Sequence, residues 1–241
     1  MNIYLIVALF VLEAVFTALF IKAGWPESTK KGFWFKMCAC VIYLLNGFYA
    51  FRSTEIRYYS LAIIAGLIAG FFGDIFLTLD PFIRDKKSKV NMIVIIIGGI
   101  CFLFGHIAYI LAFVRTLINK DLFRPALIFG VWAGAFILFI AVKSALKVNF
   151  GKLTVPVFVY AVIIIFMLSC AVCLAVYGIE GNLPAKTALI AAPVLFIISD
   201  FSLVLKFFDK ERFNSLPVRI INLGTYFLSQ MLLGLSIWYV I

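Results

Sequence analysis

Charged residues are scarce in this chain of 241 residues, at 13% against roughly 25% in a soluble globular domain. Hydrophobic residues make up 65% of the sequence, and the mean hydropathy is +1.15. So little charge excludes a soluble fold. Because a bilayer core about 30 Å thick needs about 20 apolar residues per helix, we expect a single domain over 1–241, an all-α transmembrane bundle of eight helices.

Metal-ligating and redox-active residues are also few. The sequence has one histidine, His106, and its five cysteines all lie in apolar runs. A tetrahedral zinc site needs more such ligands, and Cys170-x-x-Cys173 lacks the charged neighbours of a redox pair. We therefore expect no disulfide framework, no metal site and no cofactor.

The apolar runs predict the spans and their orientation. The spans are expected near 1–22, 32–51, 58–79, 90–113, 125–141, 155–176, 185–208 and 218–241, with only Pro193 interrupting one. The first run carries Glu13 and lacks a basic start, so it is interpreted as a retained span. Lys and Arg number 14 in the loops of one side and 6 in those of the other. The positive-inside rule then places the 14-charge side in the cytoplasm and both termini outside, in a bacterial or endoplasmic-reticulum membrane.

The basic residues total 21 against 11 acidic ones, and they are scattered over the loops. This distribution favours contact with anionic lipid over nucleic-acid binding. Four charged residues nevertheless fall within spans: Glu13, Lys36, Asp74 and Asp200. Each costs about 2.5–3.5 kcal/mol at the centre of a span, so they are expected to face the bundle interior, as interhelical contacts or as a site.

Several of the polar groups fall at similar depth. Counted from the predicted cytoplasmic ends of their spans, five lie four to eight residues in: Lys36, Asp74, Tyr160, Asp200 and Tyr226. This predicts one site about 6–12 Å below the cytoplasmic surface, with His106 deeper. The stripe formed by Asn222, Tyr226, Gln230 and Gly234 indicates a polar face on the last span, for interhelical hydrogen bonds or for a substrate cavity.

The two aspartates lie in similar strings, Gly73-Asp74-Ile75-Phe76-Leu77 and Ser199-Asp200-Phe201-Ser202-Leu203, four spans apart. A parallel four-plus-four repeat would bring them together across a pseudo-two-fold axis. Asp74 also continues the Gly66-x-x-x-Gly70 stripe, whose spacing favours close helix packing.

At these residues the chain resembles the YhhN family of membrane proteins, whose characterised members are lysoplasmalogenases. The resemblance rests on Lys36, Gly73-Asp74-x-x-Leu77, His106-x-x-Tyr109, Pro156-Val157-x-x-Tyr160, Leu195-Phe196-x-x-Ser199-Asp200 and Tyr226-x-x-x-Gln230. Three positions depart from the family pattern, Met37, Ala192-Pro193 and Ser229, and none is a candidate catalytic group.

The resemblance implies hydrolysis of the vinyl ether of a lysoplasmalogen to a fatty aldehyde and a glycerophospho-base. Asp74 and Asp200 would then be the catalytic pair, one as acid and one as base, with the assignment left open. The implied substrate-binding residues are Lys36, which would meet the lipid phosphate, and Tyr160, Tyr226, Gln230, His106 and Ser199.

Three alternatives use the same residues differently. Intramembrane carboxylates also mark proton-coupled transporters, which predict broken helices at matching places in both halves. An intramembrane aspartyl protease usually has a glycine three residues before one aspartate, and Phe71 stands there before Asp74. A structural membrane protein without catalysis is the third.

Overall fold

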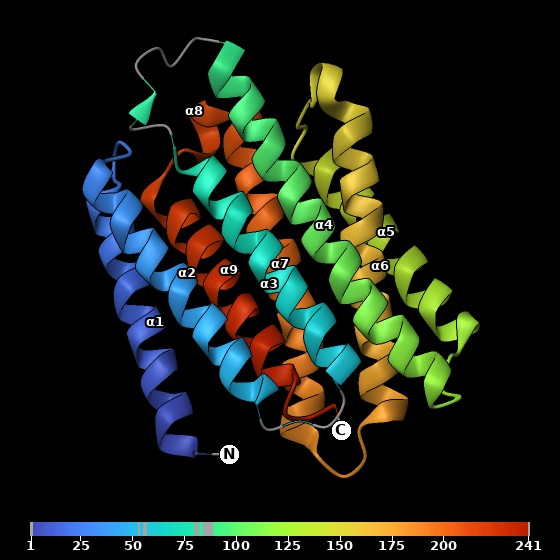
Figure 1. Cartoon of the computed structure of the whole chain (residues 1–241). Helices are drawn as coiled ribbons and strands as arrows, with labels where there is room; N and C mark the ends of the chain where they lie inside the picture. Colours follow the sequence, from blue (N-terminus) through green and yellow to red (C-terminus); the bar gives the residue numbers. More distant parts are fainter. Residues whose placement is uncertain (1, 53, 55–56, 80–81, 84–88, 241) are drawn as a thin grey trace.

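The computed structural model describes residues 2–52, 54, 57–79, 82–83 and 89–240, and every regular element within them is a helix (Figure 1). Eight of these helices are long and apolar enough to cross a membrane, which confirms the predicted bundle and fits an integral multi-pass membrane protein. They are α1 (Ile3–Ala23), α2 (Lys30–Phe51), α3 (Arg57–Leu77), α4 (Lys89–Asn119), α5 (Pro125–Ala145), α6 (Thr154–Gly178), α7 (Leu183–Phe208) and α9 (Leu216–Ser236).

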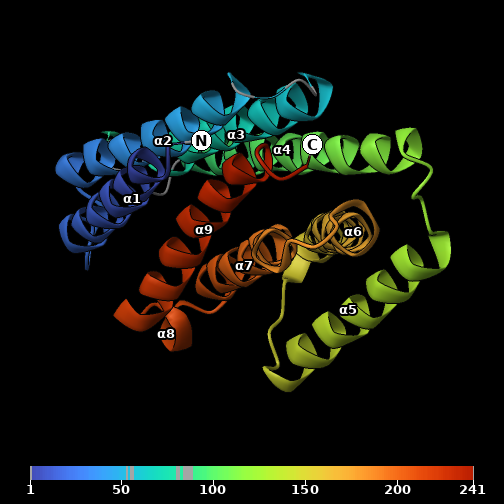
Figure 2. The same cartoon turned by 90° about the horizontal axis from the view of Figure 1, so that it is seen from below.

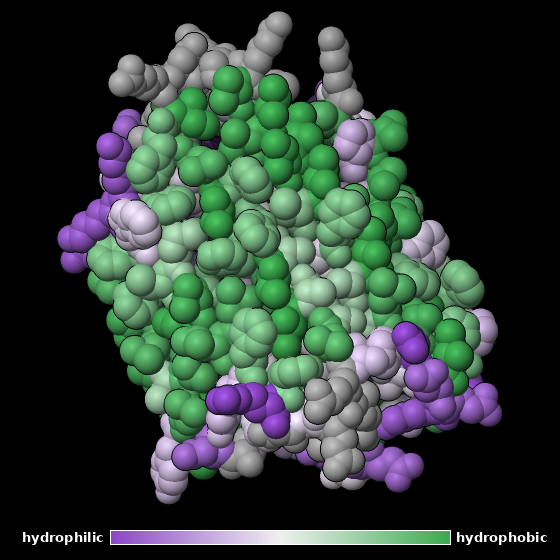
Figure 3. Space-filling view, viewed as in Figure 1, coloured by the Kyte–Doolittle hydropathy of each residue, from purple (hydrophilic) through white to green (hydrophobic). Residues whose placement is uncertain are grey.

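The start of α1 and the end of α9 lie at the same end of the bundle (Figure 1), as an even number of spans predicts. The opposite end, called here the α8 end, carries the short helix α8 (Lys210–Phe213). Apolar side chains cover most of the face seen in Figure 3, and hydrophilic ones gather toward its ends. The cytoplasmic orientation stays a prediction, and part of one of its basic loops, 84–88, falls outside the described residues.

Helix contacts in the two halves of the chain correspond. The pairs α1–α2, α2–α3 and α3–α4 match α5–α6, α6–α7 and α7–α9. In this correspondence α2 matches α6, and α4 matches α9. The two contacts between the halves, α2 with α9 and α6 with α4, are therefore equivalent. Figure 2 shows the result as two rows, α2–α3–α4 and α9–α7–α6. This pattern is the one expected of a parallel four-plus-four repeat.

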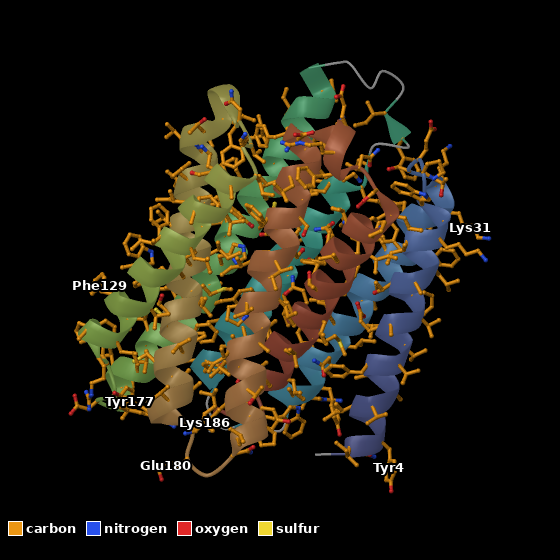
Figure 4. All side chains as sticks on the ribbon, turned by 180° about the vertical axis from the view of Figure 1, so that it is seen from behind. Tyr4, Lys31, Phe129, Tyr177, Glu180 and Lys186 are labelled. Carbon is orange, nitrogen blue, oxygen red and sulfur yellow. The ribbon has the colours of Figure 1, made fainter. Side chains whose placement is uncertain are left out.

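The outer helix of each half is packed differently. α1 contacts both α2 and α9, whereas α5 packs mainly on α6 and stands beyond it in Figure 2. Among the described residues of α5 only Ile128 is buried, and Phe129 points away from the bundle (Figure 4). The second half is therefore more open on its outer side than the first.

The observed ends of α4 and α9 differ from the ends that hydropathy predicted for these spans. α4 continues to Asn119, beyond the predicted end at 113, and its last turns accommodate the charged Arg115, whose guanidinium lies 4.3 Å from the centre of the Tyr58 ring. α9 stops at Ser236 although apolar residues continue, because the chain then forms tighter turns in which the Tyr239 N–H donates to the Ser236 carbonyl. The short helix α8, which Asp209 caps, was not predicted.

α7 runs unbroken through Pro193. The Ser229 hydroxyl of α9 donates to the Ala192 carbonyl at 2.6 Å and ties the two helices together beside this proline. The transporter alternative predicts broken helices at matching places in both halves, and α7 is continuous at its proline.

Glycines allow α3 and α4 to approach closely. A Cβ at Gly105 would lie 3.1 Å from the Gly66 carbonyl oxygen, and one at Gly66 would overlap the Tyr109 ring. A Cβ at Gly70 would lie 2.6 Å from the Gln230 amide nitrogen. The predicted Gly66-x-x-x-Gly70 stripe is thus filled by large polar side chains from α4 and α9, which brings them next to Asp74.

Candidate active site

A buried ion pair joins α2 to α3. Lys36 Nζ lies 2.8 Å from Asp74 Oδ1, and the two side chains are only 7% and 2% exposed. Lys36 also donates to the Thr78 hydroxyl at 2.8 Å, and Thr78 donates in turn to the Asp74 carbonyl one turn earlier. The Lys36 ammonium therefore bonds to two residues of α3. The resemblance had implied a contact with the lipid phosphate instead.

The second oxygen of Asp74 accepts three further hydrogen bonds. Tyr226 donates to Oδ2 at 2.5 Å, Cys40 at 3.3 Å and Tyr43 at 3.4 Å. With the Lys36 ammonium at Oδ1, Asp74 contacts four protein donors from α2 and α9, and its side chain is only 2% exposed.

A chain of hydrogen bonds extends from Tyr226 away from Asp74. Gln230 donates from its amide nitrogen to the Tyr226 oxygen at 2.9 Å, and Tyr109 of α4 donates to the Gln230 carbonyl oxygen at 2.8 Å. Both glutamine groups are used, and Gln230 is fully buried. Together with Lys36, Thr78, Cys40 and Tyr43, these residues form what is called here the Asp74 cluster.

Asp200 has a smaller set of partners, called here the Asp200 cluster. Tyr160 of α6 donates to Asp200 Oδ2 at 2.5 Å, and His106 Nε2 of α4 lies 2.8 Å from the Tyr160 oxygen and 3.6 Å from Asp200 Oδ2. Since Tyr160 donates to the carboxyl group, its oxygen can accept from the Nε2–H tautomer of His106. The other ring nitrogen, Nδ1, is buried without a hydrogen-bond partner in the described part of the chain.

The Asp200 carboxyl group is 16% exposed and borders a cavity of about 40 Å³ that Tyr160 also lines. All other wall residues are apolar and come from α5, α6 and α7: Phe139, Val157, Ala161, Ile164, Ile165, Ile197, Phe201 and Val204. No lysine or arginine among the described residues forms an ion pair with Asp200. The Oδ1 atom of Asp200 has no hydrogen-bond partner among the described residues. This carboxyl group therefore borders open space, enough for a water molecule, whereas the Asp74 carboxyl group does not line this cavity.

A larger apolar groove of about 370 Å³ lies between α5 and α6. Phe136 and Phe158 line it, and the Phe139 ring packs against both, at centroid distances of 6.0 and 5.6 Å. Because Phe139 also lines the cavity at Asp200, this ring separates the groove from the carboxyl group.

The two carboxyl groups do not share one cavity, contrary to the expectation from the sequence. Tyr226 and Gln230 bond within the Asp74 cluster, and Tyr160 bonds within the Asp200 cluster. The Phe196 ring lies between them, 5.4 Å from the Tyr226 ring and 4.6 Å from the His106 ring. The two polar clusters therefore meet at aromatic side chains, through Phe196 and through the rings of His106 and Tyr109, whose centroids are 6.5 Å apart.

The clusters correspond under the four-plus-four pattern. Asp74 of α3 takes its partners from α2 and α9, and Asp200 of α7 takes its partners from α6 and α4. These are the equivalent helices of the two halves. The equivalent positions differ in chemistry: α2 supplies Lys36 to Asp74 where α6 supplies Tyr160 to Asp200, and α9 supplies Tyr226 where α4 supplies His106.

The remaining predicted residues have other surroundings. Ser199 is buried between α7 and α9, where Asn222 donates to its carbonyl at 2.8 Å and its hydroxyl at 3.1 Å, and it does not line the cavity. Glu13 is buried on α1, and its carboxyl oxygens have no hydrogen-bond partner among the described residues. Cys170 and Cys173 are buried free thiols of α6, in agreement with a packing role.

Sequence reasoning did not assign Thr78 and Tyr109 to the site. Both positions carried a usable signal: Thr78 follows Asp74 by one helical turn, and Tyr109 follows His106 by three residues. Cys40 and Tyr43 follow Lys36 by four and seven residues on the same face of α2, and both make interhelical hydrogen bonds to Asp74.

The described residues contain no group of three or more histidine, cysteine, aspartate or glutamate side chains placed to hold a metal ion. Both clusters consist of groups that exchange protons or hydrogen bonds. The arrangement therefore suits acid–base chemistry at Asp200 in an apolar environment.

Comparison with known proteins identifies the family. The model of the YhhN family matches residues 32–237, which is most of the chain, so this protein belongs to the YhhN family. Both clusters lie inside the matched range, and α1 with Glu13 lies before it. Searches of curated proteins and of solved structures found no significant match.

Proposed function

We propose that this YhhN-family protein is a membrane hydrolase that cleaves the vinyl ether bond of lysoplasmalogens, giving a fatty aldehyde and a glycerophospho-base. The observation that carries the proposal is the Asp200 carboxyl group, which borders an apolar cavity inside the bundle and is held by Tyr160 and His106. The activity that the sequence resemblance implies is consistent with the family membership.

The surroundings of Asp200 suit a lipid with one alkenyl chain. The groove between α5 and α6 is almost entirely apolar, and its residues lie next to Phe139 at the cavity. An alkenyl chain in this groove would bring its first carbons toward Asp200 once Phe139 moves aside. The little-buried α5 gives the chain a lateral route from the bilayer.

Proton transfer by Asp200 accounts for each bond change. The protonated carboxyl group gives its proton to the β-carbon of the vinyl ether, whose π electrons form the new C–H bond. The oxocarbenium ion that results is stabilised by the carboxylate left behind. Water adds to the α-carbon and returns a proton to Asp200. Asp200 then protonates the glycerol oxygen of the hemiacetal, the carbon–oxygen bond to glycerol breaks, and the hemiacetal hydroxyl gives its proton back to Asp200 as the aldehyde forms. The carboxyl group ends each turnover in the protonated form in which it began.

Tyr160 and His106 hold Asp200 in place. The tyrosine occupies Oδ2, which leaves Oδ1 as the oxygen that exchanges protons with the substrate and water. His106 orients Tyr160 in turn, and its buried ring packs at 4.6 Å from Phe196. A carboxyl group fixed in this way transfers protons at a defined position.

Asp74 acts differently in this proposal. Its carboxyl group is 2% exposed and accepts from four protein donors, three at Oδ2 and Lys36 at Oδ1, so it is closed off from substrate. It fixes Tyr226, whose ring contacts Phe196 and so supports the packing around His106. Asp74 is therefore a positioning residue, and Asp200 is the catalytic one.

Aldehyde release from purified protein tests the proposal, with the corresponding ester lysolipid as the control substrate. Asp200→Asn keeps the side-chain shape but removes the exchangeable proton, and we expect aldehyde release to fall by about 10²–10⁴-fold. Asp209→Asn, the same change at the end of α7, should leave the rate unchanged. Absence of aldehyde from the wild-type protein, or an active Asp200→Asn variant, would refute the proposal.

A further inference from the structure

Lys143, in the last turn of α5, is a cation beside both the apolar groove and the cavity at Asp200. Its Nζ lies 5.6 Å from the centre of the Phe150 ring and 6.0 Å from that of Phe158. Phe158 lines the groove, and its ring lies 5.6 Å from the ring of Phe139, which lines the cavity. The ammonium group is therefore next to the aromatic side chains that bound these two spaces.

Lys143 also shares one face of α5 with the residues that line the groove and the cavity. It follows Phe139 by four residues and Phe136 by seven, a spacing that places side chains one above another on a helix. Since α5 runs toward the α8 end, the ammonium group lies on the α8 side of both rings (Figure 4).

The antiparallel packing of α5 on α6 fixes the level of Lys143. Trp132 of α5 donates to the Val162 carbonyl of α6 at 3.2 Å. Lys143 comes eleven residues after Trp132, so it stands opposite the start of α6. Thr154, the first residue of α6, lines the groove at this level.

Lys143 has no acidic partner in the described part of the chain. The sequence has no aspartate or glutamate between Asp121 and Glu180, a range that contains α5 and α6. The ion pairs of the described residues involve other cations. Aromatic faces attract an ammonium group but do not take up its three N–H donors, so this half-buried cation can still bind an anion.

A cation at the end of an apolar groove matches a lipid that has one chain and one phosphate. An ammonium group forms a charge-assisted hydrogen bond to a phosphate oxygen. We propose that Lys143 binds the phosphate of the lysolipid substrate, while the alkenyl chain occupies the groove and the vinyl ether lies at Asp200. This inference rests on the proposed function and gives Lys143 the contact that the resemblance had implied for Lys36.

The distance along α6 agrees with the length of the substrate. Thr154, at the level of Lys143, precedes Tyr160 by six residues, about 9 Å along the helix axis, and Tyr160 donates to Asp200. An extended glycerol backbone separates the ether oxygen from the phosphorus by about 6 Å. A hydrogen bond from the ammonium group to the phosphate adds about 3 Å. A lysoplasmalogen can therefore reach Lys143 and Asp200 at the same time.

Ligand-induced thermal stabilisation in a phosphate-free detergent measures this contact without catalysis. The probe is a 1-alkyl lysophospholipid, which has no vinyl ether to cleave, and 1-alkylglycerol is the same lipid without phosphate. We expect Lys143→Met to raise the apparent Kd for the lysophospholipid by about 10-fold or more, and to leave that for alkylglycerol unchanged.

Lys31→Met is the matched control. The Lys31 ammonium also lies over an aromatic ring, 5.7 Å from the centre of Phe35, and its residue is exposed. Figure 4 shows Lys31 on the opposite side of the bundle from Phe129 of α5. Loss of this charge should leave both Kd values unchanged.

Two further variants separate charge from packing. Lys143→Arg keeps a cation and should bind the lysophospholipid with nearly the wild-type Kd. Lys143→Gln has no charge and should bind as weakly as Lys143→Met, which it replaces if the methionine variant does not fold. Unchanged lysophospholipid binding by a folded neutral variant would overturn the proposal. Equal Kd values of the wild-type protein for lysophospholipid and alkylglycerol would also overturn it, and this comparison needs no variant.

Other phosphates distinguish the sources of the anion. Inorganic phosphate or glycerol 3-phosphate that stabilises the protein as much as the lysophospholipid would replace the lipid with a free phosphate ligand and overturn the proposal. A diacyl phospholipid whose binding falls equally in Lys143→Met would show a contact with bulk membrane lipid instead, with the same consequence. The alkyl probe is bound but not hydrolysed. An absence of aldehyde release from lysoplasmalogen would therefore refute the proposed function while this binding result stands on its own.

Discussion

Removal of the Lys36 ammonium tests whether the buried pair with Asp74 stabilises the bundle. In Lys36→Met the carboxylate keeps Cys40, Tyr43 and Tyr226 as donors but loses the charge 2.8 Å from Oδ1. Loss of one partner of a buried pair is worth about 3–5 kcal/mol, and the remaining donors place this site near the lower end, about 3 kcal/mol. At about 2–4 °C per kcal/mol for a chain of this size, Tm should fall by roughly 6–12 °C.

A second substitution shows whether the loss comes from the unpaired charge. In the double variant Lys36→Met with Asp74→Asn, no charge remains, and the amide oxygen still accepts from Tyr226, so most of the lost Tm should return. Lys31→Met, at an exposed position of the same helix, should shift Tm by less than about 2 °C. Thermal unfolding followed by circular dichroism measures all four proteins. A double variant no more stable than Lys36→Met alone would refute the reasoning.

Four further outcomes are expected. Tyr160→Phe removes the donor to Asp200 but keeps the ring beside His106. We expect kcat for aldehyde release to fall by about 10–100-fold with KM little changed. An unchanged kcat would contradict the role of Tyr160. Gly66→Ala should destabilise the protein by about 1–3 kcal/mol in thermal unfolding, because the new Cβ would overlap the Tyr109 ring. Gly99→Ala is the control, because a Cβ there meets nothing within 4 Å. Equal effects of the two variants would show that α3 and α4 pack less tightly than the structure indicates. A reporter that is active only in the cytoplasm should be silent when fused to the C-terminus, and strong activity would reverse the orientation. EDTA should leave aldehyde release unchanged, and a loss that zinc restores would mean that the carboxyl groups hold a metal.

The number of spans and the burial of the charged residues could be predicted from the sequence. Hydropathy depends only on local composition, and an intramembrane charge must face the interior wherever the helices pack. Lys36, Asp74 and Asp200 are all at interior positions in the structure. These features follow from the bilayer as a solvent rather than from any particular helix arrangement.

The pairing of the polar groups could not be predicted, because it depends on how each helix is rotated and shifted against its neighbours. His106 was expected below the layer of Tyr160, yet the two side chains are 2.8 Å apart. The reason is that α4 has 31 residues, about 46 Å, which exceeds the bilayer core, so counting from its first residue overestimates depth. The split of Asp74 and Asp200 into two clusters also depends on tertiary packing, because the rings of Phe196, His106 and Tyr109 meet between them and no local pattern predicts these contacts.

The loose attachment of α5 has a consequence for how the protein behaves outside its membrane. Because α5 leans mainly on α6, the lateral pressure of the surrounding acyl chains helps to set its position, and lipid completes the outer wall beside Phe139. Detergent supplies no such pressure. The melting temperature is determined by the tightly packed rows α2–α3–α4 and α9–α7–α6. A solubilised preparation can therefore keep a normal melting temperature although the width of the entrance to Asp200 has changed. Reconstitution into bilayers of graded thickness would then change turnover without changing stability.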